Sequence, residues 1–365
     1  MTNTISMKDK VIWGVWWGAS GDALGLAVEK KTKDEILKVV GDIREYMPIK
    51  WNGFLDKEFG KPWFPYKPED TWVISDDSIF TMAGMNSISE KWWIEIQHLF
   101  DTHKKLFDQY WWHWFGGDTR KKFKAYTWDI ASLHNHSRGN GIMMKQFPYS
   151  VWFSRIDPQA GTQYDVDTEM EKIISVTHDT PVAKITWMLH NKTLIYLLLT
   201  DPEQLDTKRL LSNLLTFSHH YEDRLIDEND PLYTPDTHMY ISPIIKKLIA
   251  QQKSIEAWHP YSLQQILDTY IIQLADPIEN KKMKPWFHVA STFGLVYACF
   301  LQNQNFEWLL NSIRIWYDTD TQAAIIGNMI WALKWPFYDQ KYVDWIQDKW
   351  VIQNSLNSFI KALSL

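Results

Sequence analysis

Apolar side chains recur at helical spacing along most of the chain. The runs 205–217, 241–249 and 262–272 each place leucine, isoleucine or aromatic residues three and four positions apart. Residues at that spacing share one face of an α-helix, whereas alternating, strand-like runs are few. The pattern predicts an all-α protein whose helices pack their apolar faces together.

Two stretches rich in Pro and Asp interrupt this pattern. They cover residues 227–235 and 276–284, and their composition is typical of surface loops that join helices. A chain of 365 residues is long enough for one large domain or for two to three average ones. Because helical spacing resumes after each loop, we expect residues 1–365 to form a single compact domain.

Composition narrows the choice of partners and compartment. The formal net charge is -6, which disfavours a nucleic-acid partner, and we interpret the basic run 120–124 as a solvated face. The single cysteine, Cys299, lies in an apolar run, so we expect it to be buried and the compartment to be reducing. The first ten residues lack a signal pattern, and Asp22 interrupts the apolar stretch that follows. We therefore expect a cytoplasmic protein with no membrane partner.

Tryptophan is unusually frequent. The chain has 22 tryptophans, scattered from Trp13 to Trp350 without a fixed period, which favours an aromatic-rich core and surface over a repeat protein. The segment 110–114, with the sequence YWWHW, has two interpretations. Core packing is the simpler one, and docking of a partner protein is the other.

A glycine-rich segment near the start predicts an unusually close helix contact. Within a helix predicted over residues 14–29, Gly14, Gly18, Gly21 and Gly25 follow one another in steps of four, three and four, so they share one face. Asp22 and Glu29 are seven residues apart and are expected on one side of the same helix. Buried acids need a partner charge or a metal ion.

Two later segments repeat one design, a hydroxyl and paired acids before a helix of small or apolar residues. They are Ser75-Asp76-Asp77-Ser78 and Asp318-Thr319-Asp320-Thr321. Helix capping explains one acid in each segment, but neighbouring carboxylates repel one another and a second acid adds little to a cap. A divalent cation would relieve that repulsion, and an all-oxygen ligand set suits Mg²⁺, Ca²⁺ or Mn²⁺ better than Zn²⁺. At this point capping and metal binding both stay open.

Other chemical motifs are weaker. The histidines His219 and His220, followed by Glu222 and Asp223, form a competing metal candidate, but adjacent residues point to different sides of a helix and chelate poorly. The sequence has no G-x-S-x-G motif, no P-loop and no Cys/His nucleophile pattern.

Five segments, in chain order, resemble the motifs of the ADP-ribosylglycohydrolase family. The glycine-rich stretch 14–29 resembles the opening helix that ends in Glu, and 75–78 resembles the first metal motif, Thr-Asp-Asp-Thr. Residues 139–145 (GNGIMMK) resemble the Gly-Asn-Gly substrate loop that ends in Met-Arg. The remaining two are Thr177-His178, at the start of a later helix, and 318–321, which resembles the final metal motif with its small-residue helix. Any one match is weak, but five in order are strong.

The resemblance implies an all-α fold with a two-metal cleft and an enzyme that hydrolyses the N- or O-glycosidic bond between ADP-ribose and an acceptor. It implies two Mg²⁺ ions as cofactors, with Mn²⁺ as a substitute. The implied metal ligands are Ser75, Asp76, Asp77, Asp318, Asp320 and Thr321. Glu29 is the first candidate for the catalytic carboxylate and Asp77 the second. The implied substrate-binding residues are Gly139, Asn140, Gly141, Met143 and His178.

This chain also departs from the family pattern. Serines replace both threonines of the first metal motif, which keeps the hydroxyls. Lys145 stands where Arg is usual, which keeps the charge but loses a bidentate donor fork. Trp316 and Tyr317 stand where glycines usually precede the last motif, so they would narrow the cleft. Asp129 faintly resembles the Asp of an Asp-Ile-Gly segment of the family, at a short spacing to the substrate loop.

The implied substrate is ADP-ribose or an ADP-ribosylated protein, with arginine as the first acceptor considered. A binding-type alternative is an immunity or scaffold protein of the same fold that neutralises a partner ADP-ribosyltransferase by docking to it. A third interpretation is a metal phosphohydrolase acting on free nucleotides. The intact acid clusters favour catalysis, since a pure binder would not need them.

Overall fold

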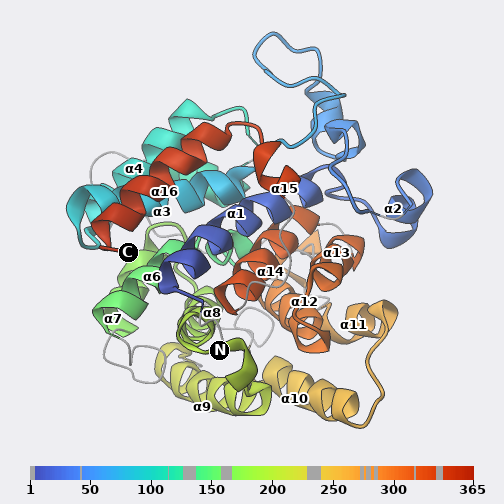
Figure 1. Ribbon diagram of the computed structural model, residues 1–365, viewed down its shortest axis with the longest axis vertical. Helices are drawn as coiled ribbons and strands as arrows, with labels where there is room; N and C mark the ends of the chain where they lie inside the picture. Colours follow the sequence, from blue (N-terminus) through green and yellow to red (C-terminus); the bar gives the residue numbers. More distant parts are fainter. Residues whose placement is uncertain are drawn as a thin grey trace.

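The computed structural model is built almost entirely of α-helices (Figure 1). It describes residues 5–41, 43–113, 115–125, 137–157, 167–227, 240–271, 275–276, 281–282, 287–315, 318–333 and 340–365. The α-helices of these residues are α1 (Met7–Leu26), α2 (Lys33–Val39), α3 (Asp76–Lys91), α4 (Ile96–Gln109), α5 (Gly117–Ala125), α6 (Phe147–Ile156), α7 (Asp167–Ser175), α8 (Pro181–Leu199), α9 (Thr207–Leu225), α10 (Ser242–Glu256), α11 (Leu263–Tyr270), α12 (Val289–Gln302), α13 (Phe306–Ile315), α14 (Thr319–Leu333), α15 (Lys341–Asp344) and α16 (Lys349–Ala362). The all-α prediction is confirmed.

Short elements complete the described chain. The 3₁₀ turns are η1 (Ile49–Trp51), η2 (Leu55–Lys57), η3 (Asn140–Ile142) and η4 (Pro202–Gln204). Strands β1 (Ala275–Asp276) and β2 (Lys281–Lys282) pair antiparallel, with Ala275 opposite Lys282. This pair overlaps the predicted loop 276–284, since β1 begins one residue before it. Most of the other predicted loop, 227–235, lies outside the described residues.

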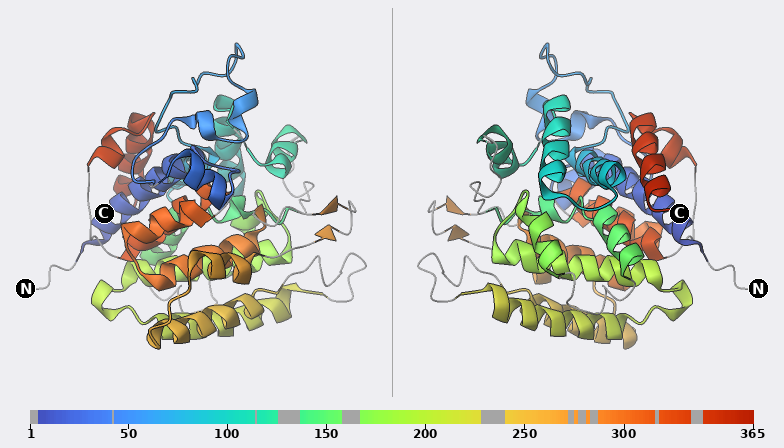
Figure 2. Two further views of the ribbon diagram at one scale, coloured as in Figure 1. Left: turned by 90° about the vertical axis from the view of Figure 1, so that its right-hand side faces the viewer. Right: turned by 90° about the vertical axis from the view of Figure 1, so that its left-hand side faces the viewer.

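The three helices predicted from apolar spacing are present as α9, α10 and α11. Local caps set where they begin: the Asp206 side chain accepts a hydrogen bond from the Arg209 amide at 2.9 Å, and Ser262 with Gln265 forms a reciprocal capping box before α11. Helices α9 and α10 form the outermost layer in Figure 2, with α8 and α12 beside them. Helices α1 and α14 lie further inside the molecule, among most of the other helices.

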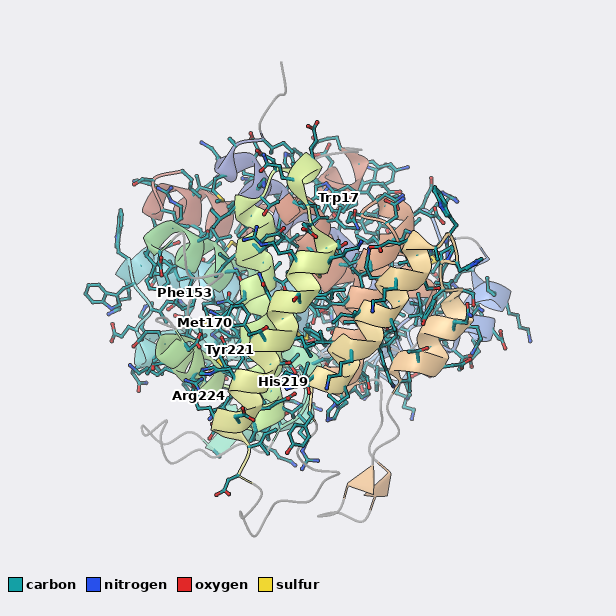
Figure 3. The ribbon with its side chains drawn as sticks, turned by 90° about the horizontal axis from the view of Figure 1, so that it is seen from below. Trp17, Phe153, Met170, His219, Tyr221 and Arg224 are labelled. Carbon is teal, nitrogen blue, oxygen red and sulfur yellow. The ribbon has the colours of Figure 1, made fainter. Side chains whose placement is uncertain are left out.

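A buried ion pair joins α7, α8 and α9 at one end of the molecule. Asp167 and Lys192 lie 3.3 Å apart, and each side chain is 1% exposed. The Tyr221 hydroxyl donates to Asp167 at 3.0 Å, and Tyr221 lies beside Met170 of α7 in Figure 3. An unpaired charge at this depth would be strongly unfavourable, so the pair and its hydroxyl donor fix these helices relative to one another.

Glycine lets α1 and α14 pack backbone against backbone. A Cβ added to Gly21 would lie 2.3 Å from the Ala323 carbonyl oxygen, and one added to Gly25 would lie 2.3 Å from that of Thr319. Real Cβ atoms essentially never approach other atoms so closely, so the contact requires glycine. The predicted close packing of the glycine face is present.

The end of α1 differs from the sequence prediction. The helix stops at Leu26, and Glu29 lies in the turn that follows it, where its amide donates to the Leu26 carbonyl at 3.3 Å. Lys30 then adopts a left-handed conformation with φ of 67°, which redirects the chain. The prediction that Asp22 and Glu29 share one face of a single helix is therefore wrong.

The basic run 120–124 is only partly a solvated face. Lys121 and Lys124 of α5 are exposed, but Lys122 is buried and its Nζ donates to the Ser175 carbonyl at 2.5 Å. Cys299 is buried, as predicted.

Substitution of Gly21 by alanine should lower the free energy of unfolding by about 3 kcal/mol or more, because the added methyl meets rigid backbone. Urea unfolding of Gly21→Ala and of the wild type measures the change. Gly117→Ala is the matched control, since its Cβ would meet nothing within 4 Å. Equal stability of Gly21→Ala and wild type would contradict the close contact.

Candidate active site

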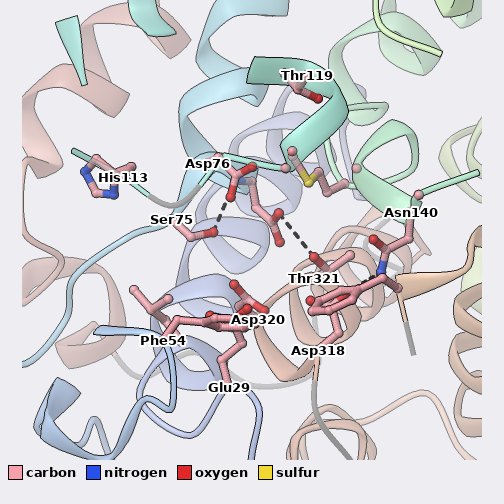
Figure 4. Close-up of a pocket in the computed structure, with 18 of the residues that line it drawn as sticks. Glu29, Phe54, Ser75, Asp76, His113, Thr119, Asn140, Asp318, Asp320 and Thr321 are labelled. Carbon is pink, nitrogen blue, oxygen red and sulfur yellow. Dashed lines mark hydrogen bonds between the residues drawn. The ribbon is translucent and has the colours of Figure 1, made fainter. Parts of the chain in front are cut away.

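A cavity of about 380 Å³ gathers most of the residues that the sequence predicted for the site (Figure 4). Its described lining includes residues from α3, α14, the turn after α1 and the segment 137–141. The predicted residues that line it are Glu29, Ser75, Asp76, Asp77, Gly139, Asn140, Gly141, His178, Asp318, Asp320 and Thr321. Segments nearly 300 residues apart in the sequence thus meet at one place.

Met143 is the exception among the predicted site residues. It is 1% exposed and belongs to the main hydrophobic core, while its neighbour Met144 lines the cavity. The segment 140–142 forms the 3₁₀ turn η3, and this turn directs Met144 rather than Met143 toward the cavity.

The carboxylates form two overlapping groups. Oxygens of Asp22, Asp77 and Asp320 lie within 4.8 Å of one another, and so do oxygens of Glu29, Asp318 and Asp320. Asp320 belongs to both groups and joins them. All five of these acids are buried. This spacing lets one cation contact several carboxylates.

Asp22 of α1 accepts hydrogen bonds from residues at the start of α3. Its oxygens accept hydrogen bonds from the Ser75 amide at 3.0 Å, from the Ser78 amide at 3.1 Å and from the Ser78 hydroxyl at 2.5 Å. The Ser75 hydroxyl in turn accepts from the Asp77 amide at 3.2 Å. Asp22 and Ser75 therefore cap the start of this helix. That leaves Asp76 and Asp77 free of the capping role.

Two buried carboxylate oxygens of the acid cluster have no hydrogen-bond partner among the described residues. They are Asp77 Oδ2 and Asp320 Oδ1. Asp77 Oδ1 accepts from the Thr321 hydroxyl at 3.3 Å, which leaves its other oxygen unused. Buried anionic oxygens without donors are strongly unfavourable unless a cation contacts them. The acid cluster therefore fits a hard divalent metal by its ligand chemistry and by these two oxygens.

Burial raises the pKa of every acid in the cluster, and repulsion from neighbouring carboxylates adds to this effect for Glu29, Asp76, Asp77 and Asp320. Burial comes first in each case, and it raises the pKa of Asp22 to about 6. For Asp76, burial together with the nearby Asp22 and Asp318 raises the pKa to about 8. The pKa values of Glu29, Asp77 and Asp320 lie well above their usual range for the same two reasons. Without a cation, these groups are not all ionised at neutral pH.

Asn140 connects the segment 139–145 to the acids. Its side-chain Nδ2 donates to Asp318 Oδ2 and to the Thr292 hydroxyl, the latter at 2.9 Å. Glu29 is held from the other side, because the Asn52 side chain donates to its Oε2 at 3.0 Å. Each of these amides contributes a neutral donor to a carboxylate and leaves the acid's charge in place.

Lys145 does not line the cavity, although it stands at the position of a family arginine. Its Nζ donates to the Thr177 hydroxyl and lies 5.5 Å from the centre of the Phe80 ring. Burial lowers its pKa to about 7, with a further contribution from Lys122. A planar guanidinium would not fit the same contacts without rearrangement.

Sequence reasoning missed the aromatic part of the cavity wall. Phe54, Tyr66, Trp112, His113 and Phe287 all line it, and the Tyr66 hydroxyl lies 2.9 Å from His113 Nε2. Tyr66 belongs to a second, smaller hydrophobic cluster formed mainly by residues 49–73. That segment has only two short 3₁₀ turns, so its sequence carries no periodic signal. Within the segment 110–114, Tyr110 is buried and Trp111 is exposed, while Trp114 lies outside the described residues. The docking interpretation stays untested.

Among the described residues, no group of potential metal ligands includes the competing histidine pair. His219 and His220 are exposed on α9. Glu222 accepts hydrogen bonds from the Ile241 and Ser242 amides, both at 2.7 Å, and so caps α10. Asp129, Trp316 and Tyr317 lie outside the described residues, and the predictions about them stay untested.

The helices bring buried carboxylates together around one cavity, and this fold and site define the class of protein. The family model for ADP-ribosylglycohydrolase matches residues 3–333, and the chain therefore belongs to the ADP-ribosylglycohydrolase family. Membership supports a glycohydrolase that acts on ADP-ribosylated substrates.

The fold also has a solved counterpart. A structure described as an ADP-ribosylglycohydrolase-related protein complex aligns with a TM-score of 0.61 and 14% identity, over 98% of this chain and 98% of that one. At that identity the likeness shows the shared fold. No curated protein matches the chain. None of the helices in the described ranges has both the length and the apolar character needed to cross a membrane.

The raised pKa values predict how stability depends on pH in the metal-free protein. The folded state holds protons that the unfolded state releases near pH 4, so the stabilisation is complete below that pH and is lost as pH rises through about 6 and 8. In EDTA, the free energy of unfolding should fall by at least about 2 kcal/mol between pH 5 and pH 8. Urea titrations at both pH values measure it, and Asp320→Asn should reduce the slope. A stability that rises over this range would contradict the assigned pKa directions.

Proposed function

We propose that the protein is a Mg²⁺-dependent hydrolase that releases ADP-ribose from a modified protein side chain, with arginine as the first acceptor. The observation that carries the proposal is the junction of the two acid clusters with Asn140 and Glu29 in one cavity. A family match over residues 3–333 supports the same chemistry. The single buried Cys299 supports a reducing compartment, which we take to be the cytoplasm.

The acid clusters would hold the metal. Two bound Mg²⁺ ions would supply positive charge that orients the ribose hydroxyls and stabilises negative charge in the cavity. The ligands in this proposal are Ser75, Asp76, Asp77, Asp318, Asp320 and Thr321. Asp320 is the natural shared ligand, because it belongs to both groups of carboxylates.

The chain's own residues then prepare the attack on the anomeric carbon. Glu29 is our candidate for the base that takes a proton from the attacking water, since it borders the cluster and its Oε2 is oriented by Asn52. Asp77 is the second candidate, because its Oδ2 has no hydrogen-bond partner among the described residues. Gly139 and Gly141 let the backbone approach the substrate closely, and Asn140 and His178 contact it. The bond that breaks joins the anomeric carbon to the acceptor atom, and the departing acceptor takes up a proton.

A docking role remains the alternative to catalysis. A protein of this fold that neutralises an ADP-ribosyltransferase by binding would not depend on the charge of Asp76 or Asp77. Two assays therefore accompany the functional test, one for hydrolysis of a modified target and one for inhibition of a transferase.

The double substitution Asp76→Asn with Asp77→Asn should abolish release of ADP-ribose. Amides are weaker ligands for hard cations and cannot serve as a base, and loss of a general base alone costs about 10²–10⁴-fold in rate. The assay measures ADP-ribose released from arginine-linked and serine-linked proteins, with Mg²⁺ or with EDTA. Asp101→Asn with Asp108→Asn, two exposed positions on α4, is the matched control. Wild-type rates in the cavity double mutant would refute the proposal, and lost hydrolysis with retained transferase inhibition would show both roles.

Gly141→Val tests the proposed close approach of the substrate loop. A Cβ at Gly141 would lie 3.6 Å from Met144 Cε and 3.8 Å from His178 Cε1, so the protein itself tolerates a Cβ at this position. We expect the dissociation constant for ADP-ribose to rise at least about 10-fold while metal affinity stays unchanged. Isothermal titration calorimetry measures both. Unchanged ADP-ribose affinity would make the turn purely structural.

A further inference from the structure

Asn52 is a buried asparagine directly behind the cavity wall. It follows the 3₁₀ turn η1, is 1% exposed, and is not among the described residues that line the cavity. Residues on both sides of it do line the cavity: Glu29 in the turn after α1, and Phe54 and Leu55 further along the chain. A buried amide between two parts of a wall can fix one part relative to the other.

The side-chain amide of Asn52 is held in one orientation. Its Oδ1 accepts hydrogen bonds from the Phe54 amide at 2.7 Å and from the Leu55 amide at 3.1 Å. Its Nδ2 donates to the Leu26 carbonyl at 2.6 Å and to Glu29 Oε2 at 3.0 Å. A reversed amide would place donors against donors on one side and acceptors against acceptors on the other. The backbone of segment 52–55 therefore fixes the donor that faces Glu29.

Further contacts join segment 26–30 to segment 52–55. The Gly53 amide donates to the Glu29 carbonyl at 3.0 Å, and Lys30 Nζ donates to the Gly53 carbonyl at 3.2 Å. Lys30 Nζ also lies 4.6 Å from the centre of the Phe54 ring. Lys30 has a φ of 67°, an unfavourable conformation for a lysine that persists only where surrounding contacts hold it. The two segments thus form one connected unit.

The Glu29 carboxylate lies between this unit and the acid cluster. One of its oxygens accepts from Asn52, and one lies within 4.8 Å of oxygens of both Asp318 and Asp320. Like charges repel, so a Glu29 side chain without an anchor would be free to rotate away from the other acids. The Asn52 donor opposes that rotation.

We propose that Asn52 is a positioning residue for Glu29, and that through Asn52 the cavity wall at Phe54 and Leu55 determines where the Glu29 carboxylate lies. The inference rests on the proposed function, because it concerns the candidate base of that same reaction. A base must lie within hydrogen-bond reach of the proton that it takes. A displaced base slows the chemical step without removing a contact to the bound substrate. Asn52 therefore acts on turnover rather than on binding.

The first test replaces Asn52 in the full-length protein at saturating Mg²⁺. Asn52→Ser keeps an oxygen that can accept from the Phe54 amide but loses the donor to Glu29. We expect kcat for release of ADP-ribose from an ADP-ribosylated protein to fall about 10–100-fold, while KM stays within about threefold. Unchanged kcat, or a loss confined to KM, would overturn the inference.

The matched control is Asn191→Ser. Asn191 is a buried asparagine on α8 whose side chain contacts Ser150 and Met170, away from the described cavity lining. We expect its kcat to stay within about twofold of the wild type, because its amide does not contact Glu29.

A second comparison separates positioning from support of the fold. In Glu29→Gln the base is absent, so adding Asn52→Ser should lower the residual rate by less than about threefold, measured with the enzyme in excess over substrate. An equal loss in the wild-type and Glu29→Gln backgrounds would show that Asn52 acts on the fold alone.

Unfolding in urea tests the same contact without an activity. Asn52→Asp places two carboxylates face to face, and Glu29→Gln then restores a donor between them. We expect Glu29→Gln to raise the urea midpoint more in the Asn52→Asp protein than in the wild type. Equal shifts would overturn the contact. If the wild type released no ADP-ribose, the proposed function would fail, and this comparison would still decide whether Asn52 holds Glu29.

Discussion

The contact between α1 and α14 is the constraint on which the site depends. The two backbones touch at Gly21 and Ala323 and again at Gly25 and Thr319. This brings Asp22 of α1 and Asp320 of α14 into one group with Asp77 of α3. The axes of ordinary packed helices lie about 8–10 Å apart, which would separate acids whose oxygens here lie within 4.8 Å of one another. The glycine face of α1 thus determines where the acidic side chains can come together.

The acids of the cluster have different roles. Asp22 accepts hydrogen bonds from three donors, the Ser75 amide and the Ser78 amide and hydroxyl, so its charge is balanced by the start of α3. Asp77 and Asp320 each keep a buried oxygen without such a donor. One carboxylate stabilises the fold around the site, while others retain the capacity to bind a cation. This division explains why both capping and metal binding describe the same short sequence motifs.

Short-range sequence patterns predicted the structural features that depend on neighbouring residues alone. Glycines at steps of three and four, and acids at helix starts, are visible in sequence because periodicity and capping act within one or two turns. The location of Glu29 was missed because a left-handed residue, Lys30, ends the α1 region without a glycine. The choice of Met144 over Met143 depends on the phase of one short 3₁₀ turn, which composition does not fix.

The aromatic wall was unpredictable for a different reason. Tyr66 and His113 come from segments 47 residues apart, and neither lies in a periodic element. Their contact depends on the small cluster formed by residues 49–73, which packs beside the main core and borders the cavity. Sequence spacing says nothing about such a contact, since only the packed fold brings the two segments together.

Lys145 lies behind the cavity and is connected to it through Thr177 and His178. The Lys145 Nζ donates to Thr177 Oγ1, and the Thr177 hydroxyl can donate its own proton to His178 Nδ1, 3.0 Å away. Burial first, and then Lys145, lowers the pKa of His178 well below its usual range, so the imidazole is neutral. A neutral ring that accepts at Nδ1 carries its proton on Nε2, and this atom faces Gly139 at the cavity wall. Lys145 is thus linked through Thr177 to a ring that lines the cavity, and this link favours the tautomer of His178 that carries its proton on Nε2.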